Sequence, residues 1–266
     1  MKLQTDHIDF YLLHALSKDR WENIILKYDL LSKMEAAKAD GRIKYIGFSF
    51  HDDHDVFMQI VNGYDKWDFC QIQLNYINTD YQAGIKGLEY AAGKGMGVII
   101  MEPLLGGKLA DPAKVVKEAL SPKKTPVEWA LDFLWNRKEV SLLLSGMSSM
   151  AQTEDNLTYA KRSSIGMLSS ADLEMLKKAK TVYDSMALVP CTKCEYCMPC
   201  PFGLNIPTIF EAYNQTAAIS LGDAKKLYDS METGADSCRK CKKCEKVCPQ
   251  HIAISETMSK ISEVFK

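Results

Sequence analysis

Cysteines gather in two runs near the C-terminal end of the chain, and their spacing points directly to metal chemistry. The second run, residues 238–248, has the spacing C-x2-C-x2-C-x3-C and is followed by Pro249. In two-cluster bacterial ferredoxins this spacing lets three thiolates bind one 4Fe–4S cluster while the fourth binds the other cluster. The first run, residues 191–200, is one residue shorter and also precedes a proline. The two runs therefore predict two 4Fe–4S clusters.

The same pattern predicts a crossed set of ligands, although the shorter first run leaves its fourth ligand open. Each cluster would take three cysteines from one run and the last cysteine of the other run. The predicted ligands are Cys191, Cys194, Cys197 and Cys248 for one cluster, and Cys238, Cys241, Cys244 and Cys200 for the other.

Zinc is the main alternative for these cysteines, because paired C-x2-C units also hold zinc and eight thiolates are enough for two ions. A zinc site needs neither a third evenly spaced cysteine nor a Cys-Pro at the end of each run, so the pattern favours iron–sulfur clusters. A disulfide framework is disfavoured because the cysteines are confined to one segment and the first residues do not resemble a signal peptide.

The composition predicts a soluble, cytoplasmic protein without a nucleic-acid or membrane partner. The chain has 266 residues, of which 47% are hydrophobic, enough for one large domain and a small one. Its net charge of −1 favours neither nucleic acid nor an anionic membrane. No apolar run approaches the ~20 residues that span a bilayer. One stretch is locally basic, and it either forms a solvated face or docks an acidic redox partner: Arg239, Lys240, Lys242, Lys243 and Lys246.

The rest of the chain alternates short apolar stretches with helical patterns, which indicates βα units around a parallel sheet. Strands are expected at residues 8–14, 43–50, 68–75, 97–103 and 141–146. Helices are expected at residues 20–39, 52–61, 83–94, 112–120, 126–136, 150–160 and 171–186. Asp52 or Asp53 is expected to cap a helix rather than bind metal, and Cys70 to pack in the core. The predicted domains are residues 1–187 and, mostly helical, residues 188–266.

Five segments of this pattern resemble the aldo/keto reductase family, in the order in which that family has them. Residues 9–14 resemble its fourth barrel strand, residues 47–50 a Gly-x-Ser strand end, and residues 71–75 its Gln-bearing sixth strand. Residues 102–108 resemble the loop after strand seven, and residues 146–156 the Gly-x-Ser-x-x-x-Gln-x-x-x-Asn element after strand eight. Together with the cysteine runs, the chain is similar to the ferredoxin-tailed branch of the family. The resemblance implies a (β/α)8 barrel with its active site at the C-terminal ends of the strands.

The resemblance also implies a nicotinamide cofactor, NADP or NAD, and a small carbonyl or alcohol substrate. His14 matches the family's catalytic histidine, which orients the carbonyl and stabilises developing negative charge. Ser49 and Gln71 could hydrogen-bond the carboxamide, and glycine N–H groups could approach the pyrophosphate. The implied cofactor-binding residues are Ser49, Gln71, Glu102, Pro103, Leu104, Gly106, Gly146, Ser148, Gln152 and Asn156.

By this alignment the sequence starts at the fourth barrel strand, so we expect a partial barrel with the equivalents of strands four to eight. It would be a fragment or one half of a two-chain barrel. The family's catalytic Asp, Tyr and Lys come from the first three βα units, so this chain alone is expected to lack carbonyl reductase activity. The predicted function is an oxidoreductase of this type coupled to electron transfer through its clusters. The alternatives are an electron-transfer protein whose barrel part is only a scaffold, and a zinc-binding interaction module.

Overall fold

The computed structural model describes residues 4–191, 193–218 and 221–266, and the chain divides into two compact units. The first unit comprises residues 1–112 and 120–178, and the second comprises residues 113–119 and 179–266. The division falls within helix α8 (Ser170–Ser185), and helix α5 (Lys114–Ala119) groups with the second unit. The domain boundary expected between residues 187 and 188 stays a prediction.

The first unit is built on a sheet of five parallel strands whose spatial order is their order in the chain. Connections between neighbouring parallel strands are almost always right-handed, so this order carries the connecting helices to one face of the sheet, as in the wall of a (β/α) barrel. The expected parallel βα architecture is confirmed, whereas its closure as part of a barrel stays a prediction. The strands are β1 (Ile8–Leu16), β2 (Ile43–Phe50), β3 (Phe69–Gln73), β4 (Gly97–Met101) and β5 (Leu142–Leu143).

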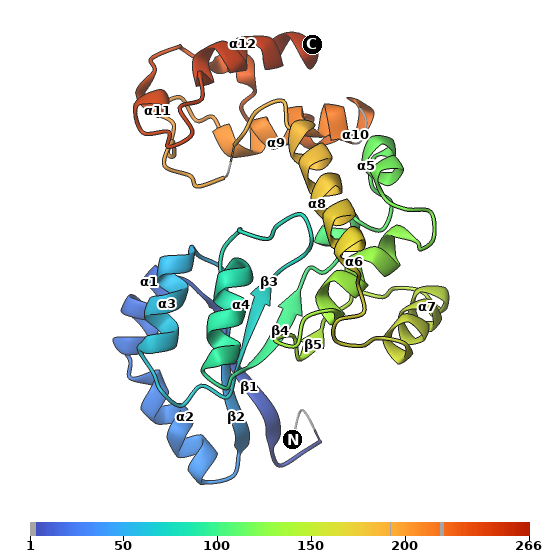
Figure 1. The fold of residues 1–266 in the computed structure, drawn as a ribbon. Coiled ribbons are helices and arrows are strands. Elements are labelled where there is room, and N and C mark those ends of the chain that lie inside the picture. Colours follow the sequence, from blue (N-terminus) through green and yellow to red (C-terminus); the bar gives the residue numbers. More distant parts are fainter. Residues whose placement is uncertain (1–3, 192, 219–220) are drawn as a thin grey trace. The chain divides into compact units, whose positions relative to one another are not determined.

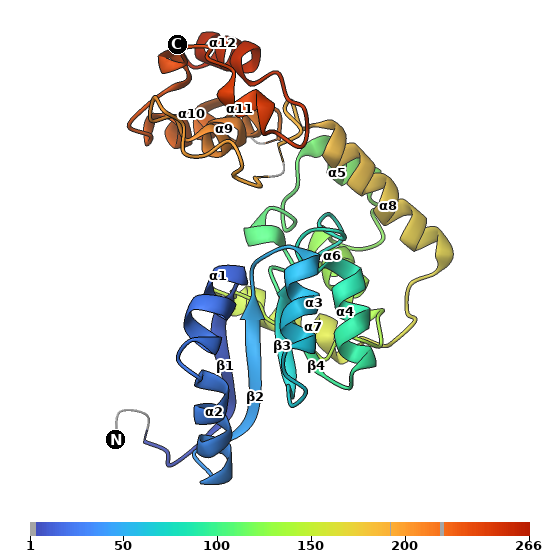
Figure 2. The ribbon, with the colours of Figure 1, turned by 90° about the vertical axis from the view of Figure 1, so that its left-hand side faces the viewer.

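Helices cover one face of this sheet, and α3 and α4 lie side by side against it in both views (Figures 1 and 2). Because side chains alternate along a strand, Phe48 and Phe50 of β2 point to the same face of the sheet, and both are fully buried. The ring of Phe48 lies 4.7 Å from that of Trp67, and the ring of Phe50 lies 5.1 Å from that of Phe57 in α3. The helices of this unit are α1 (Lys18–Arg20), α2 (Leu30–Ala39), α3 (His54–Asn62), α4 (Gly84–Gly93), α6 (Pro126–Trp135), α7 (Met150–Lys161) and the first part of α8.

Two expected elements differ in the structure. The single helix expected over residues 20–39 is wrong, because a π-helical turn (Trp21–Leu26) follows α1 and the chain then breaks at Asp29, whose φ is 48°. Aspartate tolerates this left-handed conformation, and the Ser32 hydroxyl donates a hydrogen bond to its carboxylate at 2.8 Å. The fifth strand is shorter than expected, because only Leu142 and Leu143 pair with β4, at Ile99 and Ile100.

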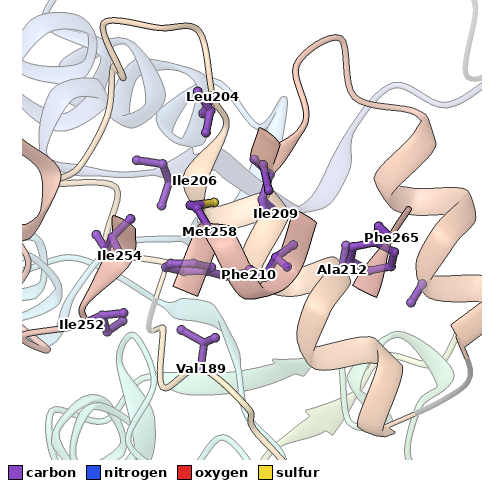
Figure 3. Packing of buried hydrophobic residues seen from close by; sticks show 13 residues of the cluster. Val189, Leu204, Ile206, Ile209, Phe210, Ala212, Ile252, Ile254, Met258 and Phe265 are labelled. Atoms are coloured by element: carbon purple, nitrogen blue, oxygen red, sulfur yellow. The ribbon is translucent and has the colours of Figure 1, made fainter. Parts of the chain in front are cut away.

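The second unit is helical, as expected, and surrounds a small apolar core. Ile206, Phe210, Ile254 and Met258 gather in this core (Figure 3), and cysteines of both runs pack against it. The Asn214 amide holds both the N–H and the carbonyl of Val189, at 2.8 and 2.9 Å, and so fixes the chain just before the first cysteine. Besides α5 and the end of α8, its helices are α9 (Ile206–Ala218), α10 (Leu221–Asp229), α11 (Lys243–Lys246) and α12 (Ile254–Val264).

In the part of the chain that the structure describes, no helix combines the length and apolar character required to cross a bilayer.

Candidate functional site

His14 lies at an irregularity of β1 that Ser49 of β2 holds in place. The register of the two strands shifts between Leu13 and Leu16, where Ala15 has a φ of 53°. The Ala15 N–H donates to the Ser49 hydroxyl at 2.7 Å, and the same oxygen lies 3.5 Å from His14 Nδ1. Arg20 donates to the His14 carbonyl at 2.9 Å. The buried Ser49 hydroxyl therefore sets the backbone that carries the exposed His14 side chain.

Gln71 lies beside Ser49, because the two residues are register partners on neighbouring strands. No residue that the structure describes hydrogen-bonds the Gln71 amide, so both ends of that amide remain available to a ligand. The structure thus brings together the two side chains that the sequence assigned to a nicotinamide carboxamide.

Gln73 and Asn75 are polar residues of this region that the sequence reasoning missed. Gln73 donates to the Glu102 carboxylate and Asn75 donates to the Glu102 carbonyl, both at 3.1 Å. The Asn75 side-chain oxygen also accepts the N–H groups of Ile77 and Asn78, at 3.1 and 2.8 Å. Their signal was the alternation of polar residues at 71, 73 and 75, since a strand places such residues on one face. Glu102 is consequently a held carboxylate at a strand end.

The glycine loop after β4 adopts the conformation that glycines permit. Gly106 and Gly107 have φ values of 62° and 92°, and a Cβ on either would meet no atom within 4 Å. The Gly107 N–H bonds the Leu104 carbonyl at 2.9 Å, whereas the Gly106 N–H bonds no described group. Pro103 is buried beneath this loop and Leu104 is half-buried. The exposed loop therefore keeps one backbone donor without a described acceptor, which suits close approach of a phosphate.

The residues expected at the adenosine end of the cofactor lie around the start of α7, where they form hydrogen bonds with residues of the same region. The Ser148 N–H and hydroxyl bond the Gln152 side-chain oxygen at 2.8 and 3.3 Å. Asn156 donates to the Ser145 hydroxyl at 3.0 Å, and Gly146 lies exposed between these groups in the sequence. Ser148 lies before α7, whose N-cap is Ser149, so it meets Gln152 through hydrogen bonds and not on a shared helix face. A ligand there would have to replace these bonds.

Two isolated expectations are confirmed. Asp53 caps α3, because its carboxylate accepts the Val56 N–H at 3.0 Å, and Asp52 accepts the Lys18 N–H at 2.7 Å. Cys70 is fully buried in β3, and burial raises the pKa of its thiol, as expected for a cysteine that serves packing.

The eight clustered cysteines of the second unit stand around two cavities, each of which draws residues from both runs. One cavity, small and partly open to solvent, is lined by Cys191, Cys194, Cys197 and Cys248. We call it the first-run cavity. The other, of similar size, is lined by Cys200, Cys238, Cys241 and Cys244, and we call it the second-run cavity. Apolar residues form much of the remaining walls, including Phe210 in the first and Met258 in the second, and the second also has Arg239, Lys240 and Lys242 in its wall. Each cavity therefore presents four thiols beside apolar side chains.

The two cysteine runs share one backbone pattern. The residues before and after the second cysteine of each run have positive φ. They are Lys193 (55°) and Glu195 (62°) in the first run, and Lys240 (53°) and Lys242 (60°) in the second. Left-handed residues alternating with ordinary ones turn successive N–H groups toward one side, which forms the nests seen at many iron–sulfur sites. The same local trace therefore surrounds both cavities.

Burial keeps several of these thiols protonated in the metal-free chain. Loss of solvation raises the pKa of Cys191 and Cys244 above the ordinary value, and raises the pKa of Cys197 to about 11. Since the thiolate is the metal-binding form, metal uptake must displace these protons.

The donor set fits a multi-atom cluster better than single metal ions. Four thiolates on one zinc ion lie at ~2.3 Å from the metal and hence close to one another. Among the described side chains, no three His, Cys, Asp or Glu residues converge closely enough to hold a single ion. The thiols instead line the walls of two separate cavities, four to each.

Comparison with known families matches both units. Residues 1–180 match the model of the aldo/keto reductase family, and residues 187–252 match that of the 4Fe-4S dicluster domain. The L-galactose dehydrogenase of Arabidopsis thaliana is 24% identical over 202 residues, which are 69% of this chain and 61% of that protein.

Solved structures give the same fold. The holo form of the aldo-keto reductase AKR11C1 from Bacillus halodurans superposes with a TM-score of 0.55 at 20% identity, covering 67% of this chain and 60% of that one. The thermostable aldo-keto reductase Tm1743, in complex with the inhibitor epalrestat, gives a TM-score of 0.54 at 21% identity, over 67% of this chain and 62% of that one. The chain therefore spans less than two thirds of the length of each of these relatives.

Proposed function

Since the chain belongs to the aldo/keto reductase family, we propose that it is a nicotinamide-dependent oxidoreductase whose second unit holds two 4Fe–4S clusters. The observation that carries the proposal is the pair of cavities, each lined by four cysteines. Three of the four come from one run and the fourth from the other, as the crossed assignment requires. When bound, the nicotinamide would supply or accept a hydride, and the clusters would supply or accept single electrons.

In the first unit, the strand-end residues would bind and orient. Gln71, whose amide has no partner among the described residues, would hold the carboxamide beside Ser49. His14, held by the Ser49 hydroxyl and by Arg20, would hydrogen-bond the oxygen of a small carbonyl or alcohol substrate. The Gly106 N–H would bind phosphate.

In the second unit, the chain would supply eight thiolates and exclude water. Cys191, Cys194, Cys197 and Cys248 would hold one cluster, and Cys200, Cys238, Cys241 and Cys244 the other. The apolar core against which they pack would keep the buried side of each cavity dry. Low solvent access and backbone N–H groups tune the potential of such clusters.

Anaerobic purification followed by iron, sulfide and zinc analysis tests the cluster assignment. We expect about eight iron atoms and about eight sulfides per chain. Zinc without sulfide would contradict the proposal and favour a zinc-binding interaction module. Cys70→Ala, which removes a cysteine outside the runs, is the matched control and should keep the full iron content.

A second candidate is an electron-transfer protein whose barrel part is a scaffold. It is favoured by the hydrogen bonds between Ser148 and Gln152, because these bonds occupy the groups that were expected to bind the adenosine end of the cofactor. Titration with NADPH and with NADH, followed by fluorescence or calorimetry, separates the two candidates. Binding that Gln71→Leu weakens supports the oxidoreductase, whereas no binding of either cofactor by the iron-loaded chain supports the scaffold.

A further inference from the structure

A groove in the second unit borders both cysteine cavities and opens to solvent. It encloses about 470 Å³, and its walls include Tyr196, Cys197, Cys241, Lys243, Cys244 and Val247. Tyr196 is 67% exposed and Val247 is 49% exposed. Exposed aromatic and aliphatic side chains beside a concave surface are the groups that a protein partner buries at the centre of an interface.

Five cations lie in the chain segment that supplies one wall of this groove, and one of them, Lys243, lines the groove itself. Glu245 is the one carboxylate among residues 238–246, and it accepts the Ser255 N–H at 2.8 Å and the Ser255 hydroxyl at 2.5 Å. None of the cations of this stretch forms an ion pair with a residue that the structure describes. All five are exposed, and we call them the basic ring: Arg239, Lys240, Lys242, Lys243 and Lys246.

The first-run cavity has no comparable group of cations in its described wall. Lys193 beside it forms an ion pair with Glu211 at 2.9 Å, and Glu195 is part of the cavity wall. The second-run cavity, by contrast, includes Arg239, Lys240 and Lys242 in its wall. Charge therefore distinguishes two cavities that are otherwise built alike.

We propose that the groove and the basic ring form the docking surface for an acidic one-electron carrier protein, which exchanges electrons at the second-run cavity. The inference rests on the proposed function, because it requires clusters in the cavities. In each exchange one protein is oxidised by one electron and the other is reduced by one electron, and no bond forms or breaks. Cationic patches steer acidic partners, and exposed Cys241 lies where such a partner would make contact.

Reduced flavodoxin, a small acidic one-electron carrier, is a suitable probe for the holoprotein. Stopped-flow absorbance gives the rate of electron transfer, and calorimetry with oxidised flavodoxin gives binding without turnover. We expect Lys240→Glu/Lys243→Glu to lower the second-order rate constant and the affinity by about tenfold at low salt. The wild-type rate constant should also fall steeply as salt is added.

Lys226→Glu/Lys260→Glu is the matched control, because it makes the same charge change elsewhere in the same unit. It should leave the rate within about twofold of wild type. If the reversed charges lower the iron content, Lys240→Gln/Lys243→Gln replaces them, with the same expected direction.

Iron and sulfide content distinguishes failure of the docking proposal from failure of the proposed function. Full iron content with a rate insensitive to salt and to the basic ring would overturn the docking surface and leave the proposed function intact. Absence of iron and sulfide would overturn the function itself. Tighter binding of single-stranded DNA than of flavodoxin, weakened by the same substitutions, would overturn the carrier in favour of nucleic acid.

Discussion

The strand-end site of the first unit and the cysteine cavities of the second unit reach their geometry by opposite routes. His14, Ser49, Gln71 and Glu102 come from segments spread over the first unit, and the register of the sheet places Ser49 beside Gln71. Three cysteines of each cavity lie within seven residues of one another in the sequence, on one local backbone trace.

This difference teaches what each site depends on. The strand-end site depends on a folded sheet and on buried hydrogen bonds such as those of Asn75. The cavities depend on a small apolar core and on one long-range arrangement. Cys200 of the first run lines the second-run cavity, and Cys248 of the second run lines the first-run cavity. The first site should therefore be sensitive to single buried polar groups, and the second to its metal.

Removal of iron should have the largest effect, and it should be confined to one of the two regions. The core of the second unit is small and the cysteines form part of its packing, so cluster binding energy is folding energy there. After anaerobic chelation we expect hydrogen-exchange protection to vanish in α9 and α12 and to persist in β2 to β4. Unchanged protection in both helices would show that the cavities stand without metal.

Pairs of cysteine substitutions test whether each cavity takes its fourth cysteine from the other run. Cys191→Ser/Cys248→Ser removes two ligands from one cavity, so about half of the iron should remain. Cys191→Ser/Cys200→Ser removes one ligand from each cavity and should lose nearly all of it. The reverse order of iron contents would mean that each run closes its own cluster.

Asn75→Ala should weaken the first unit without affecting the iron content of the second. It leaves the N–H groups of Ile77 and Asn78 without their acceptor, and Asn75 is fully buried. We expect a loss of about 2–4 kcal/mol in the free energy of unfolding, measured with urea. Asn23→Ala, an exposed control, should cost less than about 0.5 kcal/mol.

Ser49→Ala should give the smallest effect and tests whether one hydroxyl orders the catalytic candidate. The Ala15 N–H loses its acceptor, so a loss of about 1–2 kcal/mol is expected. The His14 imidazole resonances should move in an NMR spectrum, because the hydroxyl lies 3.5 Å from Nδ1. Ser32→Ala, whose hydroxyl bonds exposed Asp29, should leave those resonances in place.

The sequence predicted the sheet well because buried parallel strands are short apolar runs separated by helical periodicity. It failed over residues 20–39, since the break at Asp29 depends on one left-handed residue that leaves no trace in periodicity. β4 likewise ends just before a left-handed residue, Glu102, which periodicity does not reveal either.

Candidate residues divide in the same way. Three cysteines per cavity were readable from spacing alone, because ligands two residues apart are set by local backbone. Gln73 and Asn75 were missed, because their role is to hold Glu102, which lies 29 and 27 residues away. The mutual bonds of Ser148 and Gln152 also required coordinates, since helical spacing places residues on one face without saying what they bond.

The repeated left-handed pattern of the two cysteine runs separates backbone shape from charge. At the position after the second cysteine of each run the backbone is alike, with φ values of 62° and 60°. The side chain there is Glu195 in the first run and Lys242 in the second. A nearby cation stabilises the electron-rich form of a redox centre, and a nearby anion destabilises it. Two clusters of identical composition in these cavities would therefore differ in reduction potential, and the difference would direct an electron toward the lysine-rich side.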